Sequence, residues 1–355
     1  MDVTIYMTSI LLILCNYYII VDGIQCMDEN NSTVDWFVVY KIPKLKHKVK
    51  LIAEGVGHIL ITSTNPTKWT FSEHSINDTN SIIGNTLSPF YSKSKMDNVT
   101  YVLYNDQPPN QPSKGTKGHT KGVVLADVAS GLWLVHSVPN FPPLGSKYTF
   151  PSTGFPKGQS FLCISLSLEN LDKVGTQLQY NEPQIYASNV SETIQNRVQQ
   201  LAKAVSGITV TKPPWYNKIV ITSKKGTEFT SFAKTRKFGK DLYEDWLAPT
   251  LQADLFVETW RNGAGKLPSN CSKPFKIYNV QNVLLTVANV SFLGTQDHSK
   301  WAVSTNSSWI CIGDINRMQH QKLRGGGTVC QYNKQLAQDY KSSVTSTEKC
   351  HDQLN

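Results

Sequence analysis

Two copies of one short motif lie about half a chain apart in this sequence of 355 residues. The segments GHTKGVVL (118–125) and DHSKWAVS (297–304) share a His-x-Lys triplet followed by small or apolar residues. Their histidines are 179 residues apart (298 − 119), and an asparagine, Asn140 or Asn316, follows the next apolar segment in each case. This repeat predicts two tandem half-domains, with one motif on each side of a pseudo-twofold interface.

Strand-like and helix-like segments alternate along both halves. β-Branched and aromatic residues predict strands over 35–42, 99–104, 120–128, 131–138, 218–222, 253–260, 280–287, 300–304 and 309–315. The clearest helix is expected over 189–205, with Asn189 as its cap, and shorter ones over 240–247 and 331–341. The mixture predicts an α/β or α+β fold, in which helices cover the faces of β-sheets.

The first residues of the chain indicate that the protein is exported. The run from Ile5 to Val21 is almost entirely apolar and has the length of a signal-peptide core, although a membrane anchor is the alternative. We therefore predict a signal peptide over 1–23, an N-terminal half-domain over 24–212 and a C-terminal one over 213–355. No later segment is long and apolar enough to span a bilayer, so the mature protein is expected to be soluble and secreted or lysosomal.

Six cysteines remain once the predicted signal peptide is removed. In an exported chain an even number predicts three disulfides, for which 15 pairings are possible. A zinc site is the alternative, but the sequence has no C-x-x-C. N-glycosylation sequons are also frequent. Beyond those at Asn30 and Asn31, the candidate acceptors are Asn77, Asn98, Asn189, Asn270, Asn289 and Asn306.

The charge indicates a polyanionic partner. The net charge of +9 becomes +11 without residues 1–23, which contain two acids and no bases (9 + 2). All eight histidines follow that segment and gain protons below a pH of about 6.5. Basic surfaces bind DNA, heparin-like glycans and anionic lipids alike, so charge defines a class of partner only.

The two motifs could together hydrolyse a phosphodiester. In a strand, residues i and i+2 face the same side, so His119 projects with Lys121 and His298 with Lys300. One imidazole could attack phosphorus while the other protonates the leaving oxygen and then activates water. The lysines would hold the phosphate, and the asparagines could orient the imidazoles, so neither metal nor cofactor is expected. His-x-Lys alone is a weak signal, because lone histidines are more often structural.

Several longer segments resemble the deoxyribonuclease II family, and together they span nearly all of the mature chain. They are DWFVVYKIP (35–43), GHTKGVVLAD (118–127), GLWLVHSVPNFPP (131–143), SFAKTRKFGKDLYEDWLAP (231–249), LPSNCS (267–272), DHSKWAVS (297–304) and WICIGDINRMQHQKLRGGGTVC (309–330). That family is similar in architecture to the phospholipase D superfamily. The resemblance therefore implies a pseudodimer of two half-domains, each a β-sheet flanked by helices, with both motifs at the centre.

The resemblance also implies an activity. It is cation-independent endonucleolysis of double-stranded DNA, with little sequence specificity, favoured by acid and leaving 3′-phosphate ends. The implied catalytic residues are His119, Lys121, His298 and Lys300, with His136 in a supporting role. The family's disulfide pattern pairs Cys26 with Cys163, Cys271 with Cys350, and Cys311 with Cys330. Ala126 and Thr305 replace the Asp of the wider superfamily's motif, which lowers the expectation of phospholipid hydrolysis.

Two other functions stay open at this point. One is a secreted relative that binds DNA with little or no turnover, as a toxin, decoy or effector; the other is a phosphodiesterase for lipids or other non-DNA diesters. The sequence leaves the oligomeric state open, and it does not assign nucleophile and acid between the two histidines. The glycines 325–327 are expected to form a tight turn rather than a phosphate cradle.

Overall fold

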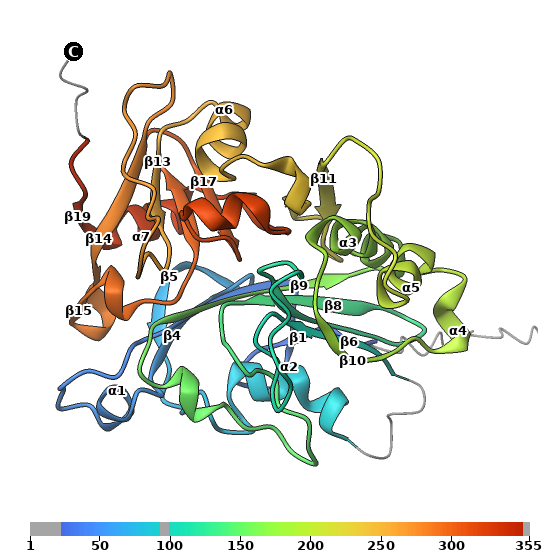
Figure 1. The fold of residues 1–355 in the computed structure, drawn as a ribbon. Helices are drawn as coiled ribbons and strands as arrows, with labels where there is room; N and C mark the ends of the chain where they lie inside the picture. The colour runs from blue at the N-terminus through green and yellow to red at the C-terminus, as the bar shows by residue number, and fades with distance from the viewer. Residues whose placement is uncertain (1–22, 93–98, 351–355) are drawn as a thin grey trace, which may run out of the picture.

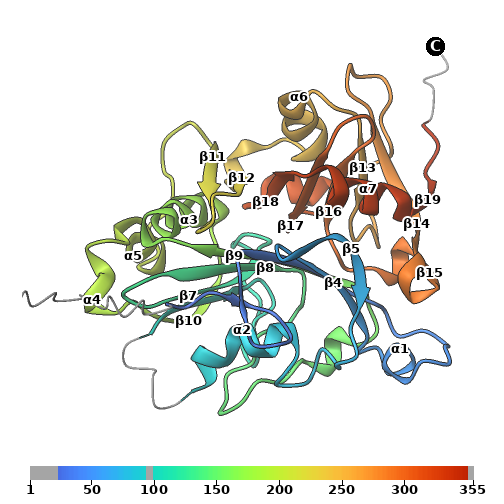
Figure 2. The same cartoon turned by 180° about the vertical axis from the view of Figure 1, so that it is seen from behind.

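The computed structural model describes residues 23–92 and 99–350. The predicted signal peptide, apart from Gly23, and the sequon at Asn98 lie outside the described residues. The described chain forms two large sheets with helices between and outside them, as Figures 1 and 2 show. The predicted class, a mixed α/β fold with two lobes, is confirmed.

The first sheet has eight strands in the order β10-β6-β7-β8-β9-β3-β4-β5, and all neighbours are antiparallel. Its central strands are buried throughout and rich in β-branched and aromatic residues, as expected for a sheet covered on both faces. The bounds are β3 (Trp36–Lys41), β4 (His58–Thr62), β5 (Asn65–Phe71), β6 (Thr100–Asn105), β7 (Lys121–Ala126), β8 (Gly131–His136), β9 (Gln159–Leu166) and β10 (Ile185–Asn189).

The second sheet has the order β11-β12-β18-β17-β16-β13-β14-β15, with β19 also paired to β14. Its neighbours are antiparallel except β13 and β14. The run β13-β16-β17-β18 repeats the arrangement of β6-β7-β8-β9 around the other motif. The bounds are β11 (Tyr216–Thr222), β12 (Glu228–Lys234), β13 (Leu255–Glu258), β14 (Ile277–Leu285), β15 (Val290–Leu293), β16 (Trp301–Ser304), β17 (Trp309–Gly313), β18 (Gly326–Tyr332) and β19 (Val344–Thr347).

Two helices hold the sheets together. α3 (Leu168–Asn181) follows β9, α7 (Lys334–Ser343) follows β18, and each packs against strands of both sheets. One continuous hydrophobic core contains residues of both helices and both sheets, including Leu171, Tyr40 and Tyr340. The lobes therefore share a core, which fixes how the two motifs face each other.

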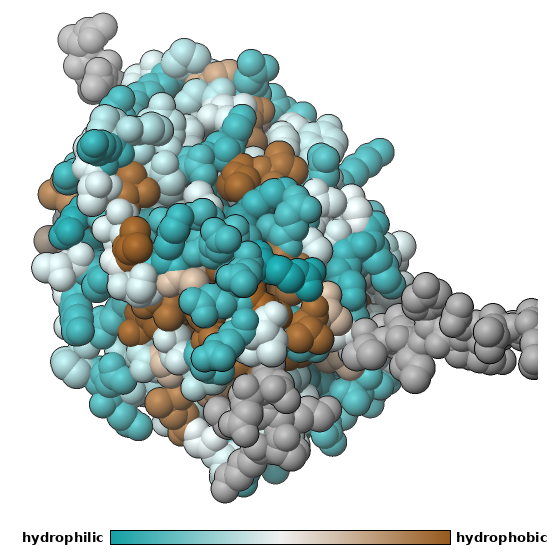
Figure 3. Space-filling model, turned by 90° about the vertical axis from the view of Figure 1, so that its right-hand side faces the viewer, coloured by the Kyte–Doolittle hydropathy of each residue, from teal (hydrophilic) through white to brown (hydrophobic). Residues whose placement is uncertain are grey.

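The remaining elements cover outer faces. β1 (Cys26–Met27), β2 (Thr33–Val34) and α2 (Ile82–Tyr91) pack on the far side of the first sheet, and α1 (Lys50–Glu54) lies near its edge (Figure 1). A π-helical turn (Tyr243–Leu247) leads into α6 (Ala248–Leu251) on the second sheet. On the face in Figure 3, hydrophilic side chains surround separate small apolar groups, as expected for a face in contact with water.

The nine predicted strands are all present, but the clearest predicted helix is wrong. Asn189 ends β10, and the rest of 189–205 forms two short helices, α4 (Glu192–Gln195) and α5 (Gln199–Val205). The break has a long-range cause, because Asp172 in α3 accepts hydrogen bonds from the main-chain N–H of Gln200 and Leu201. A carboxylate at this position satisfies the free N–H groups at the start of α5 and begins a new helix there.

All three cysteine pairings implied by the resemblance are present: Cys26–Cys163, Cys271–Cys350 and Cys311–Cys330. The third joins directly opposed residues of β17 and β18. The first sheet uses strands up to residue 189 and the second uses strands from residue 216 onward, but the exact boundary at 212/213 stays a prediction. Within 23–92 and 99–350, no helix combines the length and apolar character required to cross a bilayer.

Candidate active site

The first motif enters the interface from the Pro-rich loop that precedes β7. His119 is the second residue before that strand, and Lys121 is the strand's first residue. The main-chain N–H of Gly118 donates to Glu182 O at 2.8 Å, and that of His119 donates to Gly325 O at 2.8 Å. Because Gly325 belongs to the other half of the chain, directly before β18, that half helps to position the first motif.

The second motif is held in the same reciprocal way. His298 and Lys300 lie just before β16, and the main-chain N–H of His298 donates to Gly158 O of the first half at 2.9 Å. The Lys300 ammonium donates to His298 O, within the motif. Each motif therefore lies at the end of one sheet and is fixed by the main chain of the other half.

The imidazoles are oriented by main-chain carbonyls across the interface. His119 Nδ1 lies 2.6 Å from Asp314 O, just after β17, and His298 Nδ1 lies 3.3 Å from Ser137 O, just after β8. A carbonyl can only accept, so both contacts require the proton on Nδ1. Each Nε2 is then available for nucleophilic attack or for carrying a second proton.

Asp106 links the charged groups on the side of His119. Its carboxylate contacts the Lys121 ammonium and lies 3.6 Å from His119 Nε2 and 3.6 Å from an Arg324 guanidinium nitrogen. Arg324 comes from the other half and also donates to Lys117 O at about 3 Å. Asp106 is 7% exposed, so this is a nearly buried ionic cluster.

Burial governs the proton affinities at the site. It lowers the pKa of both His119 and His298 well below the usual value for histidine, and for His298 the cations Lys300 and Lys121 lower it further. Burial, with Lys121 next, lowers the pKa of Lys300 to about 7. Burial alone would raise the pKa of Asp106, but Lys121 and the other adjacent cations hold it well below its ordinary value. The four motif residues thus act on one another electrostatically.

Trp260 borders the site on the side of His298. Its ring centroid lies 4.9 Å from that of His298 at an angle of 70°, and Lys157 Nζ lies 4.6 Å above the indole. Lys157 comes from the first half, directly before Gly158. The site therefore combines two imidazoles, two ammonium groups and an aromatic ring at the junction of the lobes.

The three residues predicted to support the site, Asn140, Asn316 and His136, make different contacts from one another. The Asn140 amide donates to Gln107 O and Pro108 O at 3.3 Å, so it stabilises a loop. Asn316 is buried, and its Oδ1 has no hydrogen-bond partner. The expectation that these asparagines orient the imidazoles is not met, because main-chain carbonyls occupy both Nδ1 positions.

His136 is a buried neighbour of the cluster rather than a member of it. Its Nδ1 accepts from Val138 N at 3.2 Å, and its ring packs against Phe141 and Phe161. Burial lowers its pKa well below the usual value, with Lys121 as the next cause. These contacts place His136 in the packing at the end of β8, and its supporting role stays a prediction.

The tight turn predicted at 325–327 is wrong, because the structure has extended backbone there. Gly326 and Gly327 belong to β18, and Gly325 O accepts from His119. A Cβ added to Gly326 would lie 2.9 Å from His119 O, and one added to Gly327 would lie 2.0 Å from Phe232 O. The glycines are needed because main chains of both halves approach them closely.

Gly118, directly before the first motif, also has no room for a side chain. A Cβ there would lie 1.8 Å from Asn181 O, whereas one at Gly115, in the same loop, would meet nothing within 4 Å. We expect Gly118→Ala to lower the free energy of unfolding by about 1–3 kcal/mol, and Gly115→Ala to change it by less than about 0.5 kcal/mol. Urea denaturation of both variants measures this, and equal stability of the two would contradict the packing described for Gly118.

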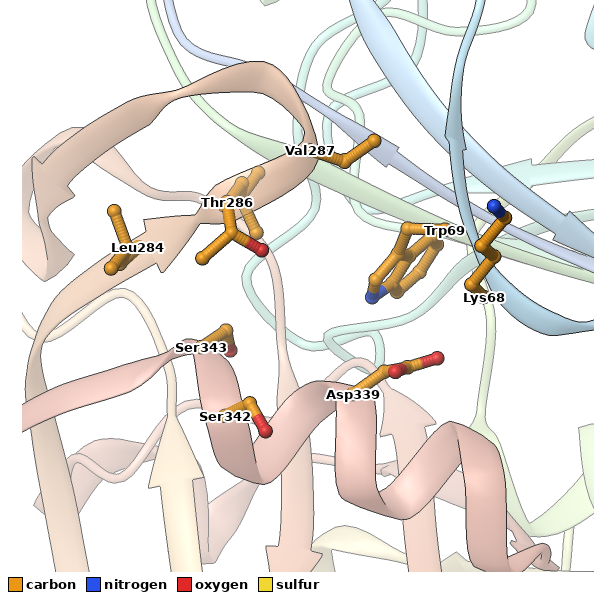
Figure 4. A pocket seen from close by; sticks show the side chains of 9 residues that line it. Lys68, Trp69, Leu284, Thr286, Val287, Asp339, Ser342 and Ser343 are labelled. Carbon is orange, nitrogen blue, oxygen red and sulfur yellow. The ribbon is translucent and has the colours of Figure 1, made fainter.

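The site is separate from the cavity in Figure 4. That cavity, of 320 Å³, lies among β5, α7 and the end of β14, and Trp69, Val287 and Asp339 are among its lining residues. None of the four motif residues lines it. Within the described ranges, no group of three or more His, Cys, Asp or Glu side chains is arranged to hold a metal ion.

Sequence reasoning missed Asp106, Arg324, Trp260 and Lys157. Asp106 and Lys157 lie in loops, Trp260 lies just after β13, and Arg324 lies in the family-like segment 309–330 but outside both His-x-Lys motifs. Their partners are 15 to more than 200 residues away in sequence, so no local spacing indicates them. The available signal was positional: Asp106 lies two residues after the predicted strand 99–104, and Trp260 is the last residue of the predicted strand 253–260.

Comparison with known proteins covers both lobes. The family model described as Deoxyribonuclease II matches residues 25–350. The chain is 40% identical to Plancitoxin-1 of Acanthaster planci over 335 residues, 93% of each chain. It is 36% identical to Deoxyribonuclease-2-alpha of Rattus norvegicus over 348 residues (96% of this chain, 99% of the relative) and 35% identical to Deoxyribonuclease-2-beta of Homo sapiens over 334 residues (92% of each).

Proposed function

The chain belongs to the deoxyribonuclease II family, and we propose that it is an acid endodeoxyribonuclease that cleaves DNA without a divalent metal and leaves 3′-phosphate ends. The observation that carries the proposal is the meeting of both His-x-Lys motifs at one interface, each held by the main chain of the other half. This geometry provides two imidazoles with Nε2 available and two ammonium groups beside them.

The reaction needs two displacements at phosphorus. In the first, an imidazole Nε2 forms a bond to phosphorus, and the bond to the 5′ oxygen breaks as the other imidazole gives that oxygen a proton. In the second, the deprotonated imidazole takes a proton from water, whose oxygen displaces the first imidazole. Lys121 and Lys300 hold the phosphate oxygens, whose charge increases in both transition states.

The surroundings of the site favour a polyanion. Arg324 and Lys117 lie on the side of His119, and Lys157 lies on the side of His298. Next to Trp260, a cavity of 410 Å³ has Lys266 and the ion pair of Arg261 with Glu348 among its lining residues. Cations on both sides of a phosphate site suit a nucleic acid backbone that continues in both directions, without reading the bases.

The protonation states predict acid activity. One histidine must carry a proton, and burial lowers the pKa of both below the usual value, so rising pH removes that proton first. As pH rises through about 7, Lys300 loses its charge as well. Activity is therefore expected to be high in acid and to fall toward neutral pH. Protonation of both histidines at still lower pH removes the nucleophile, which gives a bell-shaped profile.

The proposal is tested on purified protein with supercoiled plasmid at pH 5 and pH 7, in excess EDTA. We expect nicking at pH 5, at least about tenfold slower at pH 7. The product ends should accept a 5′ label without phosphatase treatment, and terminal transferase should extend them only after a 3′-phosphatase. DNA binding without cleavage would instead identify an inactive DNA-binding relative, and cleavage that requires Mg²⁺ or Ca²⁺ would refute the metal-free mechanism.

We further propose that the protein acts in lysosomes or outside the cell. Three disulfides suit an oxidising compartment. Among the candidate glycosylation sites, Asn77, Asn289 and Asn306 are exposed, whereas the Asn270 amide donates to Glu244. Glycan mapping of the protein secreted by cultured cells tests this, and glycans are expected at the exposed sites.

A further inference from the structure

The two motifs occupy corresponding places in the two sheets, but the side chains beside them differ. Asn105 of β6 is paired with Lys121, and Asp106 follows it. In the second sheet Glu258 of β13 is paired with Trp301; continuing that register by one residue sets Thr259 opposite Lys300, and Trp260 follows it. Asp106 and Trp260 thus occupy corresponding places beside the two motifs. One half offers its histidine a carboxylate, and the other offers an indole.

Two contacts of His119 stabilise the charged imidazolium against the burial that lowers its pKa. Nδ1 makes the short contact of 2.6 Å with Asp314 O, and Nε2 lies 3.6 Å from the Asp106 carboxylate. Both groups accept hydrogen bonds and interact more strongly with a protonated ring. The same carboxylate would repel a phosphate approaching this Nε2, because like charges within a few ångströms disfavour each other. This ring is suited to carry a proton and poorly suited to bond phosphorus.

The surroundings of His298 favour a neutral imidazole. Its Nδ1 contact with Ser137 O is longer, 3.3 Å, and its ring packs against the edge or face of Trp260. It is partly exposed, whereas His119 is 7% exposed. Among the charged groups that influence it are Lys300 and Lys121, which oppose a proton on the ring and attract phosphate oxygens. This ring is suited to attack.

We propose that the roles are fixed, with His298 as the nucleophile, His119 as the proton carrier and Asp106 as a residue that positions and charges His119. The inference rests on the proposed function and adds the direction of the reaction. His298 Nε2 bonds to phosphorus, and the electron pair of the broken P–O bond stays on the 5′ oxygen, which takes the His119 proton. Water then gives a proton to His119, its oxygen bonds to phosphorus, and the P–N electron pair returns to His298.

The proton balance around the two rings agrees with this division. Burial is the largest cause that lowers the pKa of each histidine. Around His119, Asp106 opposes the effect, while Lys121, Lys300 and Arg324 add to it. Around His298, Lys300, Lys121 and His119 add to it, and the hydrogen bond to the Ser137 carbonyl opposes it. The Asp106 carboxylate thus lies 3.6 Å from His119 Nε2, whereas the Trp260 ring occupies the corresponding place beside His298.

The test uses thymidine 3′-(4-nitrophenyl phosphate), in which nitrophenolate replaces the 5′ oxygen as the leaving group. Nitrophenolate leaves without a proton, so loss of the proton carrier should be tolerated in the first step but not in the second. We expect His119→Ala to lose DNA cleavage, yet to release about one nitrophenolate per protein and to accumulate the covalent intermediate. A quench in base, where phosphohistidine is stable, followed by peptide mass spectrometry should locate the group on His298.

His298→Ala should release no burst and form no intermediate. A burst with His298→Ala but not with His119→Ala would reverse the roles, and equal behaviour of both variants would refute a fixed division. If a variant fails to fold, wild-type protein quenched in base during turnover and analysed by peptide mass spectrometry gives the same assignment. Phosphate found on His119 in that experiment would overturn the proposal. If wild-type protein does not cleave DNA at all, the proposed function has failed instead.

Asp106→Asn tests the positioning role separately. It keeps the size of the side chain but removes the charge that stabilises imidazolium at position 119. We expect the alkaline limb of the DNA-cleavage profile to move to lower pH, and the rate on DNA to fall more than the release of nitrophenolate in the first turnover, which needs no proton from position 119. Asp106→Glu should restore the position of that limb. An unchanged limb with Asp106→Asn, or an equal loss on both substrates, would contradict the role.

Discussion

His298→Ala is expected to lower the rate of plasmid cleavage at pH 5 by about 10⁴-fold or more, with DNA binding retained. The substitution removes the imidazole at the only motif position that is partly exposed, with Lys300 and Trp260 left in place. The remaining groups can hold the phosphate but cannot form the covalent intermediate. Single-turnover cleavage in EDTA, with binding measured by fluorescence anisotropy on a labelled duplex, distinguishes loss of chemistry from loss of affinity.

The matched control is His320→Ala. His320 is exposed in the 3₁₀ turn before β18, and it lies outside the cluster of the four motif residues. The same change of residue type there should leave the cleavage rate within about twofold, because exposed substitutions away from special features have small effects. If both variants lose activity alike, or if His298→Ala remains active, His298 is not part of the chemistry.

The strands at the site could be predicted because their signals are local. The segments 120–128 and 300–304 contain the apolar runs 123–126 (VVLA) and 301–303 (WAV). The pairing of β7 with β8 and of β16 with β17 follows from short connections. A strand signal depends on a few neighbouring residues and on burial of both faces. The positions of both motifs at sheet ends therefore follow from the sequence, together with the identity of the four motif residues.

The contacts that distinguish the two halves could not be predicted. Asp314 O, 195 residues from His119, and Ser137 O, 161 residues from His298, orient the rings only because the lobes pack on a shared core. Main-chain carbonyls carry no sequence signal at all. Equivalent asparagines in the two halves suggested a symmetric orienting role, but symmetry of sequence did not extend to their contacts: Asn140 turns to a neighbouring loop.

Helix prediction failed for a related reason. The apolar spacing over 189–205 is helical, but one carboxylate from α3 starts a new helix within it. α3 itself was not predicted, although Ser167 caps it and Leu168, Leu171, Val174 and Leu178 form one buried face. Local periodicity gives the tendency to form a helix, and tertiary contacts decide where each helix begins.

Removal of the Cys26–Cys163 disulfide should cause the largest loss of stability. The bond joins β1 to β9, the strand between β8 and β3, and its cysteines are 137 residues apart. A loop of that length restricts the unfolded chain strongly, so Cys26→Ala with Cys163→Ala is expected to lower the free energy of unfolding by about 5 kcal/mol. Urea denaturation under non-reducing conditions measures the change.

The matched control removes the Cys311–Cys330 disulfide by the same two alanine substitutions. These cysteines are also buried, but only 19 residues apart, so the expected loss is about 3 kcal/mol. The order is informative because both variants replace two buried cysteines of strands by alanine and differ mainly in the length of the loop that the disulfide closes. If the second variant proves the less stable, local packing of β17 on β18 beside Asp314 matters more than restriction of the unfolded chain. In that case the stability of the core depends mainly on β17 and β18, and β17 leads directly to Asp314, whose carbonyl accepts from His119 Nδ1.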